Sequence, residues 1–288
     1  MARKIVIAAD VNADIPEEMR NACRICILPQ YYRFDQEEDV YGDEKNLTSD
    51  AFFARLQAGS RAYSMGCNPA RVQNLLEEEL REDKDVLCVL FSSALSGSYQ
   101  TVSMTAEELM GSFPGQAVLT VDSRNASFGQ GLLAYRAWSL AEAGMDVHAI
   151  RQQLEQERSR IVLKFVVKDL QYLVRGGRLS GVSASIGGIL DIKPILTVNE
   201  EGQIVPFRKV RGYQKAIREM AQEVLTLAED GMPLGVIHAC SPKEAERLRE
   251  FLRQELPGER EIFLTEINPT IGAHIGPGAV GVAYWKRD

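Results

Sequence analysis

Two serine-bearing segments carry the side chains best suited to binding an anion. Residues 91–99 (FSSALSGSY) follow an apolar run that is typical of a buried strand, and Ser96 and Ser98 stand where the next helix should begin. Ser64 shortly precedes Asn68-Pro69, a pair typical of a helix start. Hydroxyls and the free N–H groups of a helix N-terminus both favour an anion. We therefore expect two polar loops suited to an anionic group, although helix capping by itself would also explain them.

Histidine could give one of these serines a catalytic role. The chain has three histidines, and we expect His148 on a helix, His238 within a strand and His274 in an exposed glycine-rich loop, residues 271–278 (IGAHIGPG). A serine nucleophile also needs a carboxylate that orients the histidine, and no motif links an Asp or Glu to His274. The residues leave open a serine-dependent acyl-ester hydrolase that uses Ser96 and His274.

A double-glycine turn precedes a weakly charged segment. Arg175 and Arg178 flank Gly176-Gly177, and residues 186–196 (IGGILDIKPIL) are nearly uncharged and interrupted by glycine. Such a segment makes a poor surface helix. It is suited either to the wall of a buried apolar space or to ordinary core, and both interpretations stay open.

Two further motifs predict no cofactor. Residues 129–134 (GQGLLA) match a dinucleotide fingerprint, but they do not directly follow a strand, and the region where an acidic residue should end a second strand is helical. We interpret them as a loop entering a helix and keep a nucleotide-binding regulator as an alternative. Cys23 and Cys26 lie where a helix ends rather than where it begins, so we expect neither a redox centre nor a metal site there.

Composition disfavours several classes of protein. Of 288 residues, 45% are hydrophobic and 25% are charged, which is typical of a folded chain of about two domains. The net charge of −7 disfavours a nucleic-acid partner. No stretch approaches the roughly 18 apolar residues of a membrane span, and five cysteines favour reduced thiols in a cytoplasm.

The apolar runs predict an α/β fold with two domains. Runs at 4–9, 86–91 and 117–121 alternate with helical patterns, and such continuous runs favour strands covered on both faces in a parallel α/β/α layer. We expect this first domain to span residues 1–160, with a small excursion from the sheet near 30–47. Further strands and two amphipathic helices predict a mixed-sheet α/β domain over residues 161–288.

Taken in order, these segments resemble the DegV family of bacterial fatty-acid-binding proteins. Each matching segment is weakly specific, but the ordered set is highly specific and covers the chain from end to end. The segments are residues 92–100 (SSALSGSYQ), 122–133 (DSRNASFGQGLL), 169–180 (DLQYLVRGGRLS), 191–196 (DIKPIL), 209–211 (KVR) and 272–278 (GAHIGPG). The fold implied by the resemblance, a Rossmann-like first domain and a mixed α/β second domain, agrees with the apolar pattern.

The resemblance implies a lipid carrier without a catalytic site of its own. One long-chain fatty acid would place its tail in a tunnel of the second domain and its carboxylate at the interdomain cleft. A separate ATP-dependent fatty acid kinase would phosphorylate it there, and no further cofactor is implied. Ser64, Ser96 and Ser98 match carboxylate-binding positions, Arg175, Arg211 and His274 match positions at the kinase-facing cleft, and Ile186, Ile189, Leu190 and Ile192 would line the tunnel.

The chain departs from the family pattern near the expected head-group site. Met65-Gly66-Cys67 replaces the usual Ser-Gln-Pro, residues 8–12 (AADVN) replace the usual Thr-Asp-Ser-Thr opening, and Ser98 replaces a threonine. Ser64 still has a hydroxyl, so carboxylate binding is expected to persist. We expect uncharged donors to contact the carboxylate and cationic groups to lie further out, because a salt bridge would make the carboxylate a poorer nucleophile.

Overall fold

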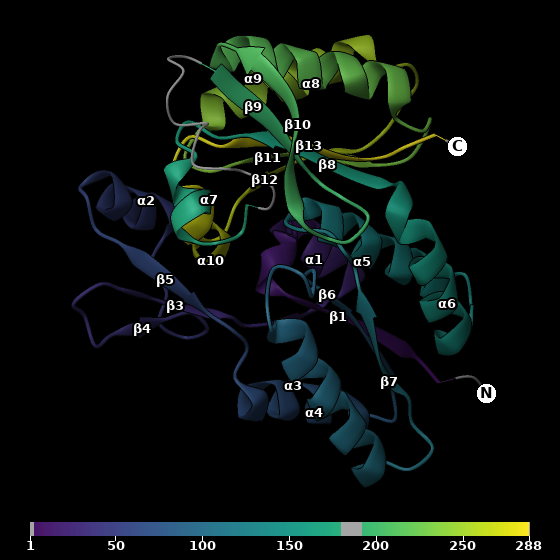
Figure 1. The fold of residues 1–288 in the computed structure, drawn as a ribbon. Helices are drawn as coiled ribbons and strands as arrows, with labels where there is room; N and C mark the ends of the chain where they lie inside the picture. The colour runs from purple at the N-terminus through teal and green to yellow at the C-terminus, as the bar shows by residue number, and fades with distance from the viewer. Residues whose placement is uncertain (1–2, 180–191, 288) are drawn as a thin grey trace.

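The first half of the chain forms a parallel sheet, as its apolar runs predict. The computed structural model describes residues 3–179 and 192–287. The sheet has the order β2-β1-β6-β7, and all neighbouring strands are parallel (Figure 1). Its strands are β1 (Ile5–Asp10), β2 (Cys26–Leu28), β6 (Asp85–Leu90) and β7 (Val118–Asp122). Because parallel strands end at the same edge, the residues that follow β1 and β6 meet there, and Phe91 N–H donates to Asp10 Oδ2 at 2.8 Å.

Helices cover both faces of this sheet. On one face, α3 (Pro69–Arg81) and α4 (Ser98–Ser112) pack in a core with Val86, Cys88 and Leu90. On the other face, α1 (Glu17–Cys23), α5 (Phe128–Glu142) and α6 (Val147–Glu157) pack in a core with Leu87 and Val89. Alternate residues of β6 therefore face opposite helical layers, as expected for a strand buried on both sides.

A small antiparallel sheet interrupts the first half. β3 (Tyr31–Phe34) and β4 (Val40–Tyr41) pair within the region expected as an excursion, and β5 (Ala62–Met65) pairs with the other side of β3. The helix α2 (Ser49–Gln57) lies between β4 and β5 in sequence. The expectation of a loop around Ser64 is wrong, because Ser64 pairs with Tyr32 and belongs to strand β5.

The second half forms a six-stranded mixed sheet. Its order is β10-β9-β8-β13-β11-β12, with β11 and β12 parallel and the other neighbours antiparallel. The strands are β8 (Ile161–Val166), β9 (Ile192–Val198), β10 (Ile204–Arg211), β11 (Leu234–His238), β12 (Ile262–Glu266) and β13 (Val280–Trp285). The predicted fold class, a parallel α/β/α unit followed by a mixed-sheet α/β unit, is confirmed.

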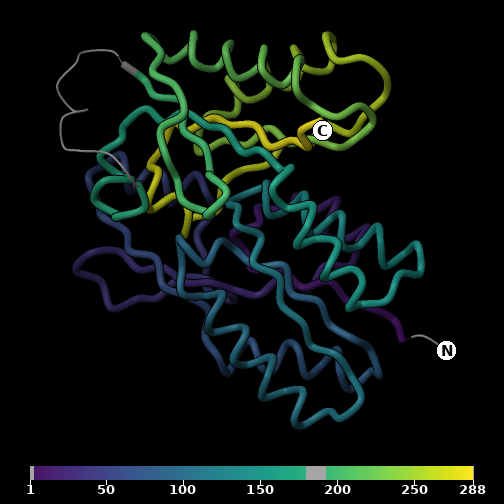
Figure 2. Tube along the Cα trace, turned by 45° about the vertical axis from the view of Figure 1, so that its right-hand side comes forward, coloured from purple at the N-terminus to yellow at the C-terminus, as the bar shows by residue number. Residues whose placement is uncertain are grey.

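The two sheets lie in two lobes that pack on each other (Figures 1 and 2). α8 (Tyr213–Leu227) and α9 (Pro242–Glu255) cover the outer face of the second sheet. Its inner face packs on α5, so closely that a Cβ at Gly235 would lie 1.9 Å from the Phe128 ring. Two short helices, α7 (Gln171–Arg175) and α10 (Pro269–Ile275), complete this lobe. Within the described residues, no helix is long and apolar enough to cross a membrane.

A buried carboxylate fastens α10 to the first lobe. Asp14 follows a short 3-10 helix, η1 (Val11–Ala13), and accepts hydrogen bonds from Ser127 Oγ, from Asn268 N at 2.9 Å and from Asn268 Nδ2 at 2.8 Å. Burial raises the pKa of Asp14 to about 7. Asn268 is the N-cap of α10. The contact between Asp14 and Asn268 therefore sets where α10 presents its side chains.

Candidate amphipathic ligand site

A cavity lies where the two lobes meet. Its walls come from both halves of the chain, so both lobes must fold to form it. The lining residues are Asn12, Gln30, Ser64, Phe91, Leu95, Ser96, Ala126, Ser127, Leu163, Phe165, Leu173, Arg178, Ile204, Ile237, Ile267, Thr270, Ile271, His274 and Ile275.

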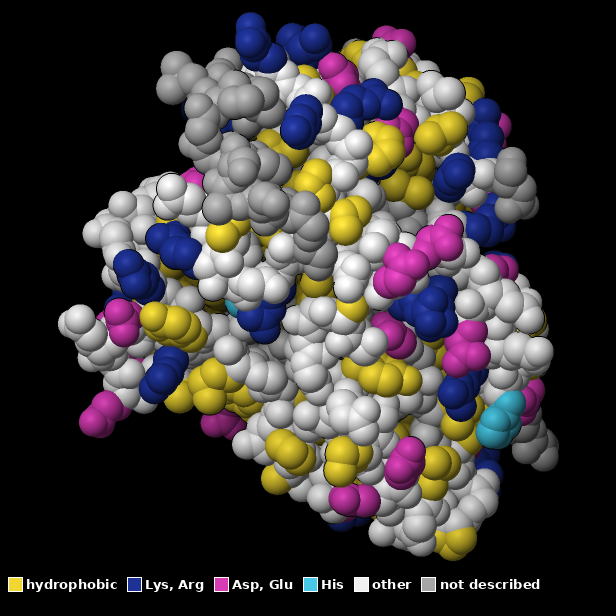
Figure 3. All heavy atoms as spheres, in the orientation of Figure 1, with side chains coloured by type: hydrophobic (Ala, Val, Ile, Leu, Met, Phe, Trp, Pro, Cys, Tyr) yellow, Lys and Arg dark blue, Asp and Glu magenta, His cyan; other side chains and the backbone are white. Residues whose placement is uncertain are grey.

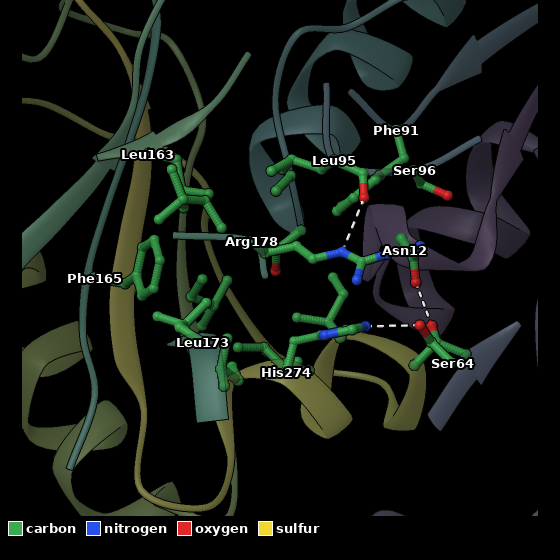
Figure 4. A pocket seen from close by; sticks show the side chains of 18 of the residues that line it. Asn12, Ser64, Phe91, Leu95, Ser96, Leu163, Phe165, Leu173, Arg178 and His274 are labelled. Carbon is green, nitrogen blue, oxygen red and sulfur yellow. Dashed lines mark hydrogen bonds between the residues drawn. The ribbon is translucent and has the colours of Figure 1, made fainter. Parts of the chain in front are cut away.

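The cavity has a polar end and an apolar end. Figure 4 shows Asn12, Ser64 and Ser96 at one end, with Leu163 and Phe165 at the other. Most of the apolar lining belongs to strands and short helices of the second lobe, including β8, β10, β11, α7 and α10. An enclosed apolar space that ends in a few polar groups is suited to a ligand with a long apolar tail and a small polar head.

Ser64 and His274 meet at the polar end although 210 residues separate them in sequence. The Ser64 Oγ lies 2.6 Å from His274 Nε2 (Figure 4). The expectation of an exposed loop histidine is wrong, because His274 lies in α10 and is half-buried. Burial, and secondly the charge of Arg178, lower the pKa of His274 to about 4. The imidazole is therefore neutral near pH 7.

A neutral imidazole has one N–H, and the surroundings favour its place. His274 Nδ1 is buried and has no hydrogen-bond partner among the described residues; a Cβ at Gly176 would lie 2.3 Å from it. Because a buried unpaired N–H is rare, we expect the proton on Nε2, from which it is donated to Ser64 Oγ. The hydroxyl proton of Ser64 is then free to be donated to a ligand.

This geometry does not support the serine hydrolase. Ser96 Oγ donates to Ser98 Oγ at 3.1 Å, whereas His274 pairs with Ser64. In the described part of the chain, no carboxylate accepts a hydrogen bond from His274 Nδ1, so the orienting third group of a triad is missing. A histidine with a pKa near 4 would also be a weak general base.

Ser98 lies behind Ser96 rather than on the cavity wall. Its side chain is buried, and its Oγ accepts hydrogen bonds from Cys67 N at 3.3 Å and from Ser96 Oγ. Ser98 N–H donates in turn to Ser96 Oγ at 3.2 Å. The structure thus brings Ser64 and Ser96 to the cavity and places Ser98 where it holds Ser96 and the segment after β5.

The arginines occupy three different places. Arg178 lines the cavity, and its Nε donates to Leu95 O at 3.3 Å. A guanidinium therefore lies at the polar end of the cavity, where we expected only uncharged donors. Arg175 is exposed, and its guanidinium lies 4.8 Å from the centre of the Tyr172 ring. Arg211 is exposed at the end of β10 and does not line the described cavity.

A second, outer hollow adjoins the cavity. It shares Ser64, Arg178 and His274 with the cavity, so these three side chains stand between the enclosed space and the outside. Figure 3 shows several Lys or Arg side chains over the region of β5 and α7. The other residues that line the hollow are Leu56, Ser60, Arg61, Ala62, Tyr63, Tyr172, Arg175, Gly176 and Ala273.

The tunnel lining expected from the sequence stays a prediction. Ile186, Ile189 and Leu190 lie outside the described residues, and Ile192 is the first residue of β9. The described residues supply a different apolar wall, which the sequence did not single out as cavity lining. It includes Leu163, Phe165, Leu173, Ile204 and Ile237.

Sequence reasoning also missed several polar residues of the site. Arg178 lies in the segment 169–180, where the sequence pattern gives it no role, and no motif marks Asn12, Gln30 or Thr270. Asn12 follows β1 at the same sheet edge where Ser96 follows β6. The rule that the ends of parallel strands converge could therefore have found Asn12.

The two weaker motifs contribute to packing. Residues 129–134 lie wholly within α5, which corrects the expected loop, and a Cβ at Gly131 would lie 2.8 Å from Ala13 O. Burial raises the pKa of the Cys23 thiol to about 11 and that of Cys26 to about 12. No group of three or more His, Cys, Asp or Glu suited to a metal occurs in the part of the chain that the structure describes.

Fold and site together define a class: two-lobed α/β proteins with an amphipathic cavity between a parallel and a mixed sheet. The chain belongs to the DegV family, whose model, described as an uncharacterised protein family, matches residues 4–287. A DegV domain-containing protein of Clostridium perfringens is 32% identical over 284 residues, which cover 98% of this chain and 97% of the relative.

Solved structures of similar proteins are described as fatty-acid-binding. A DegV family protein of Thermus thermophilus is 29% identical and superposes with a TM-score of 0.86, covering 99% of this chain and all of that one. A fatty-acid-binding DegV family protein of Streptococcus agalactiae is also 29% identical, with a TM-score of 0.85 and complete coverage of both chains. The resemblance expected from the sequence is confirmed.

Proposed function

We propose that this protein binds one long-chain fatty acid in the cavity between its lobes. The observation that carries the proposal is the polarity of the cavity, with hydroxyl, amide and guanidinium groups at one end and aliphatic and aromatic side chains at the other. The carboxylate would lie near Ser64 and Ser96, and the tail would extend along Leu163, Phe165 and Leu173. The fatty-acid binding described for the solved relatives supports this assignment.

The apolar end accounts for most of the expected affinity. A common fatty acid has about 15 methylene groups, and burial at about 0.8 kcal/mol each gives an upper bound near 12 kcal/mol of favourable transfer free energy. Ordering the chain offsets several kcal/mol of this. The head-group contacts therefore fix orientation more than they add affinity.

The protein is further proposed to present the bound acid to a separate ATP-dependent kinase. Arg175 and His274 face the outer hollow, where a phosphoryl donor could approach the carboxylate. Exposed cations on a chain of net charge −7 would attract the phosphates of a nucleotide. The chain itself would supply no catalytic site, and five unpaired cysteines support a cytoplasmic place for it.

The two proposed domains are residues 1–160 and residues 161–288. The second sheet begins at Ile161, and the cavity lies between the two units so divided.

Two variants separate lipid retention from presentation. Ser96→Ala removes a cavity hydroxyl, whose single proton would turn from Ser98 Oγ to the carboxylate of the bound acid. This variant is expected to weaken fatty-acid retention several-fold, since one hydrogen bond to a charged group is lost. Arg211 is exposed and does not line the described cavity, so Arg211→Ala should leave fatty-acid retention unchanged. Phosphorylation of the bound acid by a purified fatty acid kinase with ATP should become slower in this variant. Retention is measured by mass spectrometry of bound lipid. Equal lipid loss in both variants would contradict the assignment.

A further inference from the structure

Asn12 lies at the polar end of the cavity with its backbone held in place. The residue is buried, with 4% of its surface exposed. Asn12 N–H donates to Asp10 Oδ1 at 3.1 Å, and Asp10 in turn accepts from Phe91 N–H at 2.8 Å. Through Asp10, the backbone of Asn12 is therefore held at the ends of β1 and β6, which lie next to the cavity.

The cap of α10 fixes the side-chain amide of Asn268. Asn268 Oδ1 accepts from Thr270 N–H at 2.8 Å, as an N-cap does. Its Nδ2 must then point away from the helix, and it donates to Asp14 Oδ1 at 2.8 Å and to Asn12 Oδ1 at 3.2 Å. The reverse orientation would leave the α10 N–H groups without their acceptor.

The orientation of Asn268 fixes that of Asn12. Asn12 Oδ1 accepts from Asn268 Nδ2 and from the Thr270 hydroxyl. Turning the Asn12 amide would set two NH₂ groups face to face, which are both donors. Asn12 Nδ2 is thus left with no hydrogen bond to the described protein, on a side chain that lines the cavity beside the end where Ser64 and Ser96 lie (Figure 4).

We propose that Asn12 Nδ2 donates a hydrogen bond to the carboxylate of the bound fatty acid and selects an ionised acid over an uncharged lipid of the same length. The inference rests on the proposed fatty-acid binding. A hydroxyl such as that of Ser64 can donate or accept, whereas an NH₂ group only donates. A donor of fixed direction gains most from a charged acceptor, because charge-assisted hydrogen bonds are about twice as strong as neutral ones.

Asn12→Ala tests the donor without adding a charge. The change leaves no partner unpaired. Asn268 Nδ2 still donates to Asp14 and to the Val11 carbonyl, and the single proton of the Thr270 hydroxyl, which lies near both Asn12 Oδ1 and Asn268 Oδ1, is then donated to Asn268 Oδ1. Dissociation constants are measured for palmitic acid and for hexadecan-1-ol on the full-length protein. We expect the acid to bind about tenfold more weakly and the alcohol unchanged within about twofold, so that the acid-to-alcohol selectivity falls about tenfold.

Asn12→Asp gives an isosteric second test. The aspartate keeps the oxygen that accepts from Asn268 and Thr270 and replaces the donor by a charged oxygen, so palmitic acid should bind more weakly still. Alcohol binding reports that each variant is folded.

The outcomes separate this inference from the proposed function. Unchanged selectivity in Asn12→Ala, or an equal loss for both ligands, would overturn the role of Asn12 while wild-type binding stands. A wild-type protein that binds neither ligand would overturn the proposed function and this inference with it.

Discussion

At the scale of single residues, the polar end of the cavity depends on a histidine kept neutral by its surroundings. Burial lowers the pKa of His274 to about 4, and the adjacent Arg178 acts in the same direction. A neutral imidazole that donates from Nε2 leaves the Ser64 hydroxyl free to act as a donor towards the ligand. His274 thus serves to orient Ser64 rather than to act as a base.

The neutral state of His274 predicts a pH dependence of stability. Its pKa is lower in the folded protein than its ordinary value of 6.5, so between these pH values the unfolded chain binds more protons than the folded one. The contribution of His274 to the free energy of unfolding should fall as the pH falls from about 6.5 to about 4, whereas Asp14, whose pKa burial raises to about 7, contributes in the opposite direction over this range. A plot of the free energy of unfolding against pH should therefore have a more positive slope for the wild type than for His274→Gln between these pH values. Urea titrations at several pH values measure the slope.

Nuclear magnetic resonance gives a direct check on the same group. The imidazole nitrogens should show a neutral Nε2–H tautomer at pH 7 and titrate near pH 4, with the urea-unfolded protein as the reference. A titration midpoint near 6.5 in the folded protein would contradict this account of His274.

At the scale of elements, the site is built by α7 and α10 packing closely on each other. Gly276, with φ +67°, lies against Tyr172 so closely that a Cβ would come within 2.4 Å of the ring. Gly176 leaves similar room for His274. Glycines at these points let the two short helices approach, and this approach positions the imidazole against Ser64 on β5.

Adjacent glycines provide a matched pair of variants. Gly176→Ala should displace His274, because its Cβ would lie 2.3 Å from Nδ1, and fatty-acid affinity should fall about fivefold through loss of the Ser64 contact. Gly177→Ala has open space but φ +67°, so it should cost about 1 kcal/mol of stability while affinity is kept. Unfolding curves and ligand titrations of both variants make the comparison, and equal affinity in the two would contradict the positioning of His274 by this packing.

Local patterns predicted the elements better than the site. The apolar runs before Asp10 and Ser92 marked strands because their periodicity and length are set locally. Ser64 in a strand and His274 in a helix could not be predicted in this way, since β5 is fixed by pairing with Tyr31–Phe34 and α10 by the Asn268 cap and its bond to Asp14. The chemistry of their side chains marks Ser64 and His274 as candidate site residues. That the two contact each other could not be predicted, because the contact joins segments that lie 210 residues apart in sequence.

At the scale of the whole molecule, the cavity belongs to the contact between the lobes. Phe91, Leu95 and Ala126 of the first lobe close a space whose tail end is lined by Leu163, Phe165 and Ile237 of the second. The first lobe supplies Asn12, Ser64 and Ser96 at the polar end, and the second lobe supplies most of the apolar wall.

The central claim, that one long-chain fatty acid occupies this cavity, is tested most directly by mass spectrometry of the purified protein, first under native conditions and then after denaturation. The account predicts one extra mass per chain that corresponds to a C14 to C18 fatty acid and is released only when the protein unfolds. A protein that is empty as purified and takes up no added fatty acid would contradict it.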